Sequence, residues 1–238
     1  MATPNHRQEN QRVYILHTYP FKETSLIAEV FTEKFGRIPV VAKGARRPRS
    51  SIRGMLQSFQ VLLANWSGKS ELKSLNGLEW CEKLTILEGD ALMCGFYLNE
   101  LMMRLLPRDE PHPDLFYFYH ETILALSEGR ELTITLRRFE LKLLQALGYA
   151  VTLDHDEDSN PIIPDKIYRY EAEYGACDLT KTDHGIKVLG KTLLDMASDQ
   201  YVDKETQQQS KQLMRYLLGF YLGDKPLHSK QLFVDLQG

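Results

Sequence analysis

The stretch SLIAEVFTEKFGRIPVVAKGA, residues 25–45, is typical of two β-strands joined by a tight turn. Both halves are rich in Val, Ile, Leu and Phe, which fit a pleated, half-buried surface. Gly36 lies between the halves and supplies the backbone freedom that a hairpin turn favours. No helix-length periodic segment with caps interrupts the pattern. The stretch therefore predicts a β-hairpin.

The β pattern continues on both sides of this hairpin, from Arg12 to Trp80. RVYILHTYPF precedes it, and MLQSFQVLLANWSGKSELKSLNGLEW follows it with a second glycine turn. About five strands in about 70 residues is the size of a small closed barrel, in which closure removes exposed strand edges. We expect an N-terminal OB-type β-barrel in residues 1–80, with an SH3-like barrel as the alternative.

The pattern becomes helical after the barrel, and the predicted fold class is α+β. Three apolar segments with short connections predict antiparallel helices. These segments are residues 89–107, 112–129 and 131–149. Residues 152–180 are polar and rich in proline, and their alternation around KIYRYEAEYGACDL favours a small β-hairpin. We therefore expect residues 81–238 to form a mostly α-helical domain with a hairpin insertion.

The polar N-terminus and the short apolar runs favour a cytoplasmic protein with no membrane association. In that compartment Cys81, Cys94 and Cys177 are expected to be reduced. They are far apart and form no CxxC pair, so a zinc ribbon is excluded by the number of ligands.

Charge divides the chain into two parts. Residues 1–83 hold 13 Lys and Arg against 7 Asp and Glu, whereas the remainder holds 16 against 25. This asymmetry indicates that the first part meets a polyanion and the second meets something else, although chance placement of solvated charges is the alternative.

The stretch VAKGARRPRSSIRG, residues 41–54, concentrates cations without one acid. Guanidinium groups match phosphate oxygens bidentately, so the stretch predicts a nucleic-acid-binding loop. Its cations are Lys43, Arg46, Arg47, Arg49 and Arg53. Further cations in the barrel region extend the predicted DNA-binding set, and they are Lys22, Arg37, Lys69 and Lys73.

Aromatic residues accompany these cations, and base stacking on aromatic rings is a common mode of single-strand binding. The candidates are Tyr19, Phe21, Phe59 and Trp66. The alternative is that the aromatics fill the barrel core and the cations only solubilise it. We expect Phe59 and Trp66 to be core residues.

The third helical segment contains two apolar stripes, and Arg137 lies within the second of them. At 100° per residue, that stripe comprises Ile134, Leu141 and Leu144. An arginine among exposed aliphatic residues can hold the carboxylates of a partner peptide whose apolar side chain enters the adjacent pocket. The alternative is that Arg137 pairs with Glu140 or Glu100 inside the fold.

The sequence contains no recognisable catalytic or cofactor motif. It lacks GxSxG, P-loop, HExxH and dinucleotide-binding glycine patterns, so we expect no enzyme and no cofactor. DHDEDSNPIIPD, residues 154–165, lacks the glycine and the final glutamate of a calcium loop, so we expect a solvated acidic loop without metal. A nuclease that uses Asp154 and Asp156 is a weaker hypothesis.

Several segments resemble the bacterial DNA repair and recombination mediator family RecO. They are HTYPFKETSLIAEVFTEKFGRIPVVAKGARRPRSSIRGMLQSF, FYLNELMMRLLP, LRRFELKLLQALGY and GDKPLHSKQLF. The resemblance runs over nearly the whole chain in the order of the family, and KGAR and LRRFE are its most specific pieces.

The resemblance implies an OB domain, a helical domain, binding of single- and double-stranded DNA, and annealing of complementary strands. It also implies cooperation with RecR to load RecA, and docking on the acidic C-terminal tail of single-stranded DNA-binding protein. The first arginine of LRRFE is associated with that tail, which corresponds to Arg137. Some members hold zinc with four cysteines, whereas only Cys177 lies in that region here. An RNA- or ribosome-associated OB module is the alternative function, because it shares the basic loop.

Overall fold

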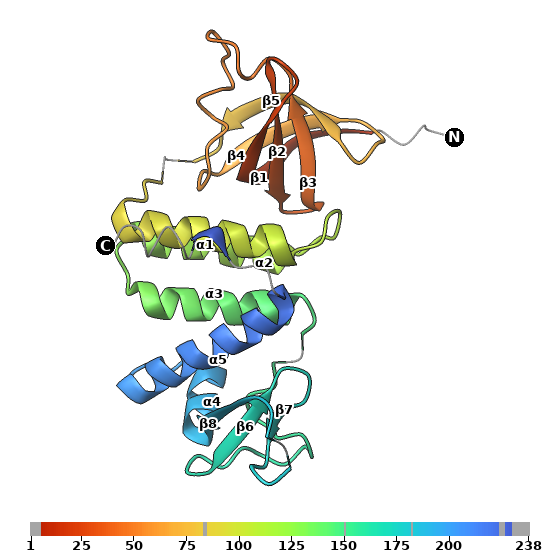
Figure 1. Cartoon of the computed structure of the whole chain (residues 1–238). Helices are drawn as coiled ribbons and strands as arrows, with labels where there is room; N and C mark the ends of the chain where they lie inside the picture. The colour runs from red at the N-terminus through yellow and green to blue at the C-terminus, as the bar shows by residue number, and fades with distance from the viewer. Residues whose placement is uncertain (1–5, 83–84, 150, 182, 224–226, 230–238) are drawn as a thin grey trace. The chain divides into compact units, whose positions relative to one another are not determined.

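The computed structural model describes residues 6–82, 85–149, 151–181, 183–223 and 227–229 (Figure 1). These residues form two compact units. The first comprises the described residues of 1–129 together with 227–229, and the second comprises those of 130–226. No helix within the described ranges is long and apolar enough to cross a bilayer.

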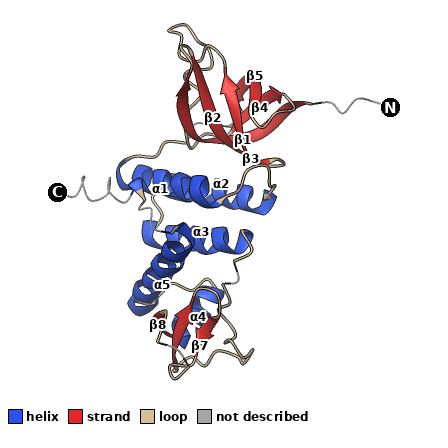
Figure 2. Ribbon diagram, turned by 45° about the vertical axis from the view of Figure 1, so that its right-hand side comes forward, coloured by secondary structure: helices blue, strands red, loops and turns tan. Residues whose placement is uncertain are grey.

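The first unit begins with a closed five-stranded barrel, as the sequence predicts (Figure 2). Its strands are β1 (Arg7–Phe21), β2 (Ser25–Thr32), β3 (Gly36–Ala42), β4 (Leu62–Ser67) and β5 (Lys73–Trp80). They pair in the order β1-β2-β3-β5-β4, and β4 pairs with β1 to close the ring. Only the β3–β5 pair is parallel, which makes this the partly parallel, Greek-key barrel of the OB type.

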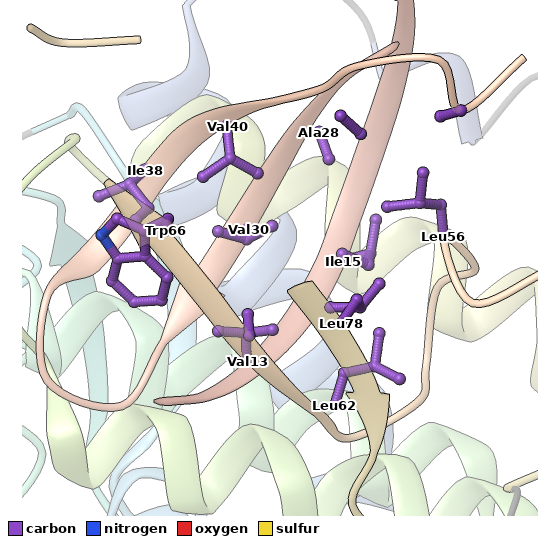
Figure 3. Packing of buried hydrophobic residues seen from close by; sticks show 13 residues of the cluster. Val13, Ile15, Ala28, Val30, Ile38, Val40, Leu56, Leu62, Trp66 and Leu78 are labelled. Carbon is purple, nitrogen blue, oxygen red and sulfur yellow. The ribbon is translucent and has the colours of Figure 1, made fainter. Parts of the chain in front are cut away.

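The barrel interior is filled by small and branched side chains that alternate along the strands. Val13 and Ile15 from β1 meet Val30 from β2 and Val40 from β3 inside the barrel (Figure 3). Alternation places every second side chain inside, so these residues bury apolar area while their neighbours face outward. Trp66 belongs to the same cluster, which confirms it as a core residue.

Two helices complete the first unit, namely α1 (Gly89–Leu105) and α2 (Pro113–Ser127). Asn99 of α1 donates from Nδ2 to the carbonyl of Leu16, 2.9 Å away, and its Oδ1 accepts from the Tyr119 hydroxyl at 2.5 Å. The Tyr119 ring packs edge-on against Tyr14 of β1. The last barrel strand ends at Trp80, and α1 and α2 pack with the barrel in one compact unit.

A buried ion-pair network joins β2, β3 and the segment after α1. The Glu29 side chain is only 1% exposed and accepts from Arg37 Nη1 at 2.9 Å. Arg37 Nε donates to the Leu106 carbonyl at 2.9 Å, and Arg108 forms a second ion pair with Glu29. Burial makes these charges dependent on one another, because removal of either sign leaves an uncompensated charge in a low dielectric.

The second unit combines helices with a small antiparallel sheet. Its helices are α3 (Leu132–Ala146), α4 (Gly190–Ala197) and α5 (Lys204–Leu222), and its strands are β6 (Ile167–Glu171), β7 (Gly175–Cys177) and β8 (Ile186–Leu189). The predicted hairpin is present as β6 and β7, but the sheet has the order β7-β6-β8. The strand β8, which lies beyond residue 180 and carries no clear alternation, adds a third strand to the predicted hairpin.

We predict that Glu29→Ala lowers the free energy of unfolding by about 3–5 kcal/mol, because it leaves the guanidinium of Arg37 partly buried without a counter-charge. Urea denaturation followed by circular dichroism measures this change. Glu9→Ala is the matched control, since the Arg7–Glu9 pair is exposed on both sides and its loss costs less than about 1 kcal/mol. Equal losses in the two variants would contradict the assignment.

Candidate nucleic-acid interface

The predicted basic loop leaves the C-terminal end of β3 and is built from consecutive turns. We define the basic loop as residues 43–56. Arg47 N donates to the Gly44 carbonyl at 3.0 Å, and Ser50 N donates to the Arg47 carbonyl at 3.1 Å. Gly44 has a φ of 69°, a left-handed conformation that favours glycine. The loop therefore has its own backbone hydrogen bonds rather than an extended, solvated chain.

Apolar residues anchor the basic loop to the barrel core. Ala45 and Leu56 are buried members of the barrel cluster, and Ile52 and Met55 pack against it. In Figure 3 Leu56 reaches the cluster beside Leu78 and Ile15. The loop closes one part of the barrel interior with these side chains, so the residues between them must face away from it.

The cations of the basic loop face solvent. All five are exposed, and they are Lys43, Arg46, Arg47, Arg49 and Arg53. Within the described residues none of them lies in ion-pair distance of a carboxylate. A cluster of uncompensated like charges raises the local electrostatic potential and attracts a polyanion.

The basic loop also contacts the turn between β1 and β2. Arg46 N donates to the Thr24 carbonyl at 2.9 Å, and Arg46 Nη1 lies 3.4 Å from the Lys22 carbonyl oxygen. Lys22 is itself exposed. The structure thus brings Lys22 together with the basic loop at the turn where β1 passes into β2.

The other predicted cations lie elsewhere on the barrel. The Arg37 side chain is 12% exposed and bound to Glu29, and the Lys73 side chain is 18% exposed and paired with Asp109 at 3.0 Å. Protein acceptors thus already hold both groups, and their role as DNA contacts stays a prediction. Lys69 is exposed in the turn between β4 and β5, away from the basic loop.

The aromatic candidates separate by burial. Phe59 is buried, which confirms the core role expected for it alongside Trp66. Tyr19 is 43% exposed on β1, and its ring meets the imidazole of His17 edge-on with centroids 4.5 Å apart. Phe21 is half-buried, and Lys22 Nζ lies 5.4 Å from its ring centroid. Tyr19 is thus the most available of the predicted stacking residues.

The second predicted site lies on α3, where Arg137 is buried and paired inside its unit. Arg137 Nη2 donates to Glu140 Oε1 at 2.5 Å, and Nη1 lies 3.5 Å from the Lys211 carbonyl oxygen. Of the two acids weighed as partners, Glu140 is the one that Arg137 contacts. The Nε of Arg137 is also buried, and it has no acceptor among the described residues.

The apolar residues around Arg137 are more deeply buried than residues that line an open peptide-binding surface. Leu144 is fully buried and Leu141 nearly so, whereas Ile134 is half-buried. Leu144 is therefore not open to solvent, and its role in binding a peptide stays a prediction. Helical spacing alone does not predict this difference, because it does not show which residues of α3 another part of the chain covers.

The acidic stretch 154–158 forms a turn around its own backbone. Asp156 Oδ1 accepts from Asn160 N at 2.9 Å and from Asp158 N at 3.1 Å. No group of three or more His, Cys, Asp or Glu side chains with metal-binding geometry occurs in the described part of the chain. Burial raises the pKa of the Cys177 thiol to about 12, so this cysteine stays a protonated core residue.

Sequence reasoning missed two features. One is the Glu29 network, because Arg108 is distant from Glu29 in sequence. The other is a cavity between β1 and α1, which Tyr19 and Phe96 both line. Neither feature has a local sequence motif. For the cavity, the one signal in the sequence is the aromatic residue Tyr19.

Family models match nearly the whole chain. The model described as Recombination protein O N terminal matches residues 6–84, and the model described as Recombination protein O C terminal matches residues 87–231. The first match covers the barrel strands, and the second begins just before α1.

Full-length relatives agree with these matches. A DNA repair protein RecO of Nitrosospira multiformis is 51% identical over 240 residues, which cover 100% of this chain and 99% of that protein. A DNA repair protein RecO of Dechloromonas aromatica is 47% identical and covers 96% of each chain. A third, from Burkholderia pseudomallei, is 46% identical and covers 99% of this chain and 86% of that protein.

Proposed function

The chain belongs to the RecO family of DNA repair proteins, recombination mediators that are not enzymes, and on this premise we propose how it binds DNA. The basic loop holds the phosphates of single- and double-stranded DNA. Lys22 extends this surface across the turn between β1 and β2. Lys69 adds a separate, weaker contact, whereas Arg37 and Lys73 stay bound to carboxylates of the fold.

One observation carries this proposal. Apolar residues fix the basic loop to the barrel, and its five exposed cations have no carboxylate partner in the described part of the chain. An anchored loop loses little conformational entropy when it binds, so more of the phosphate interaction remains as affinity. The Glu29 network shows the contrast, because its arginines are already neutralised.

Phosphate contacts also account for annealing. They neutralise the strand without reading its bases, so two complementary strands can be held side by side whatever their sequence. We therefore propose strand annealing with little sequence preference, and no step that requires bond cleavage. The proposed activity takes place in the cytoplasm at the nucleoid, where the DNA substrate is.

The second unit is proposed to bind the acidic C-terminal tail of single-stranded DNA-binding protein through Arg137, beside Ile134 and Leu141. The buried Nε of Arg137 supports this, because an incoming carboxylate supplies the acceptor that it lacks. Entry of the tail then requires a local shift of the Arg137 side chain. Cooperation with RecR and loading of RecA complete the proposed mediator function.

We predict that the triple substitution of Arg46, Arg47 and Arg49 by Ala makes single-strand binding less dependent on salt. The slope of the logarithm of the binding constant against the logarithm of the salt concentration should become shallower by about 2, at roughly 0.7 per lost phosphate contact. Fluorescence anisotropy of a labelled oligonucleotide across a salt series measures the slope. The control is the triple substitution of Lys187, Lys204 and Arg215 by Ala, which removes the same amount of positive charge from exposed positions of the second unit.

An unchanged slope in the loop variant, or an equal change in the control, would count against the basic loop as the DNA contact. Repeating the series with RNA of the same sequence tests the ribosome-associated alternative. A strong preference for RNA would favour that alternative, since the 2′-hydroxyl is the group that distinguishes the two.

We predict that the double substitution Arg137→Leu with Glu140→Leu weakens binding of a synthetic acidic tail peptide at least tenfold. The double change replaces the buried pair by apolar side chains, which keeps the fold. Arg138→Ala is the control, because Arg138 is exposed and paired with Asp199. Isothermal titration calorimetry measures both, and unchanged peptide affinity in the folded double variant would refute the assignment of Arg137.

A further inference from the structure

A cavity of about 580 Å³ lies between β1 and α1 in the first unit. This volume is within the range of sites that bury small organic molecules. Side chains from two elements line most of it: Leu16, His17 and Tyr19 from β1, and Phe96, Met103 and Arg104 from α1. Its walls are mainly apolar, and two aromatic rings are open to it.

The two aromatic rings are held in place and yet exposed. Tyr19 is 43% exposed and Phe96 is 42% exposed. Tyr19 is held edge-on by His17, and Phe96 meets the buried ring of Phe59 with centroids 5.2 Å apart. Rings that are fixed and exposed offer flat faces at little entropic cost, which favours the stacking of another planar group.

One carboxylate and one guanidinium line the cavity, so their charges nearly cancel. Glu100 is the only carboxylate in the described lining, and both of its oxygens accept from the chain. His228 N and Ser229 N donate to it at 2.8 Å, and Ser229 Oγ donates at 2.6 Å. The remaining polar lining includes the guanidinium of Arg104, so the site does not repel a phosphate that accompanies a planar group.

The cavity lies close along β1 to the proposed DNA surface. β1 runs from His17 through Tyr19 to its end at Phe21, and Lys22 follows directly. At about 3.3 Å per residue, Tyr19 lies about 10 Å from Lys22, whose carbonyl contacts Arg46. A strand gripped by the basic loop therefore reaches the cavity within a few nucleotides.

We propose that this cavity binds an unpaired nucleobase of single-stranded DNA, with Tyr19 as the principal stacking face and Phe96 as the opposite wall. The proposal rests on the DNA binding proposed above and adds a site that distinguishes single strands from duplexes. Bases of a duplex are already stacked and paired, so they cannot enter. A base that does enter is withheld from random pairing until a complementary strand competes for it.

Tyr19→Ala is expected to weaken binding of a single-stranded oligothymidylate about 5-fold to 150-fold, the loss of roughly 1–3 kcal/mol for one stacked base. Duplex affinity and the salt slope should stay unchanged, because no phosphate contact is lost. Tyr19→Phe should restore single-strand affinity. Tyr174→Ala is the control, since Tyr174 is 66% exposed in the second unit. Anisotropy with single-stranded and duplex probes measures all four proteins.

The outcomes separate this inference from the DNA binding on which it rests. If the wild type binds neither probe, the proposed function itself fails. If the wild type binds both and Tyr19→Ala binds single strands as the wild type does, only the base site fails. Equal losses on single strands and duplexes would also overturn it. If Tyr19→Ala weakens the binding of a protein partner but not of single-stranded DNA, the cavity is a peptide-binding site and the proposal fails.

An independent measurement checks the position of the base. An oligonucleotide that carries 5-iodouracil should photocrosslink to Tyr19 or Phe96, and the crosslinked peptides are identified by mass spectrometry. Crosslinks confined to the basic loop would overturn the proposal, because they would show the bases outside the cavity.

Discussion

The placement of the basic loop depends on the need to fill the barrel interior. A closed barrel of five strands leaves its ends open, and unfilled apolar volume is costly. Here Ala45 and Leu56 supply part of the missing packing from the connection between β3 and β4. Once these side chains point inward, the intervening arginines have only the solvent side available. The hydrophobic packing of the barrel thus makes the charged side chains of the basic loop face solvent.

Burial of charge decides which cations remain available to a ligand. Arg37 and Arg137 are both held by buried glutamates, Glu29 and Glu140, and each pair stabilises its own unit rather than presenting a free cation. The exposed arginines of the basic loop have no such glutamate partner among the residues that the structure describes. This division suits the proposed DNA binding, because exposed phosphate contacts are weak individually and exchange readily.

Much of the fold follows from local patterns. Apolar alternation and Gly36 predict the barrel, and the apolar segments that follow predict the helices. No local pattern in the sequence distinguishes Arg37, which is largely buried and paired, from Arg46, which is exposed. Glu29 lies opposite Pro39 in the β2–β3 register, so Arg37 is its diagonal neighbour on one face. Register, and the approach of α1 to β1 that forms the cavity, arise only when distant segments pack together.

The most direct test of the central claim is lysine footprinting, with acetylation of the protein alone and in complex with a single strand followed by mass spectrometry. The account predicts strong protection of Lys22 and Lys43, which flank the exposed arginines, and none of Lys187 or Lys204 in the second unit. Uniform acetylation of all four lysines in the complex, at an oligonucleotide concentration that saturates binding, would contradict it.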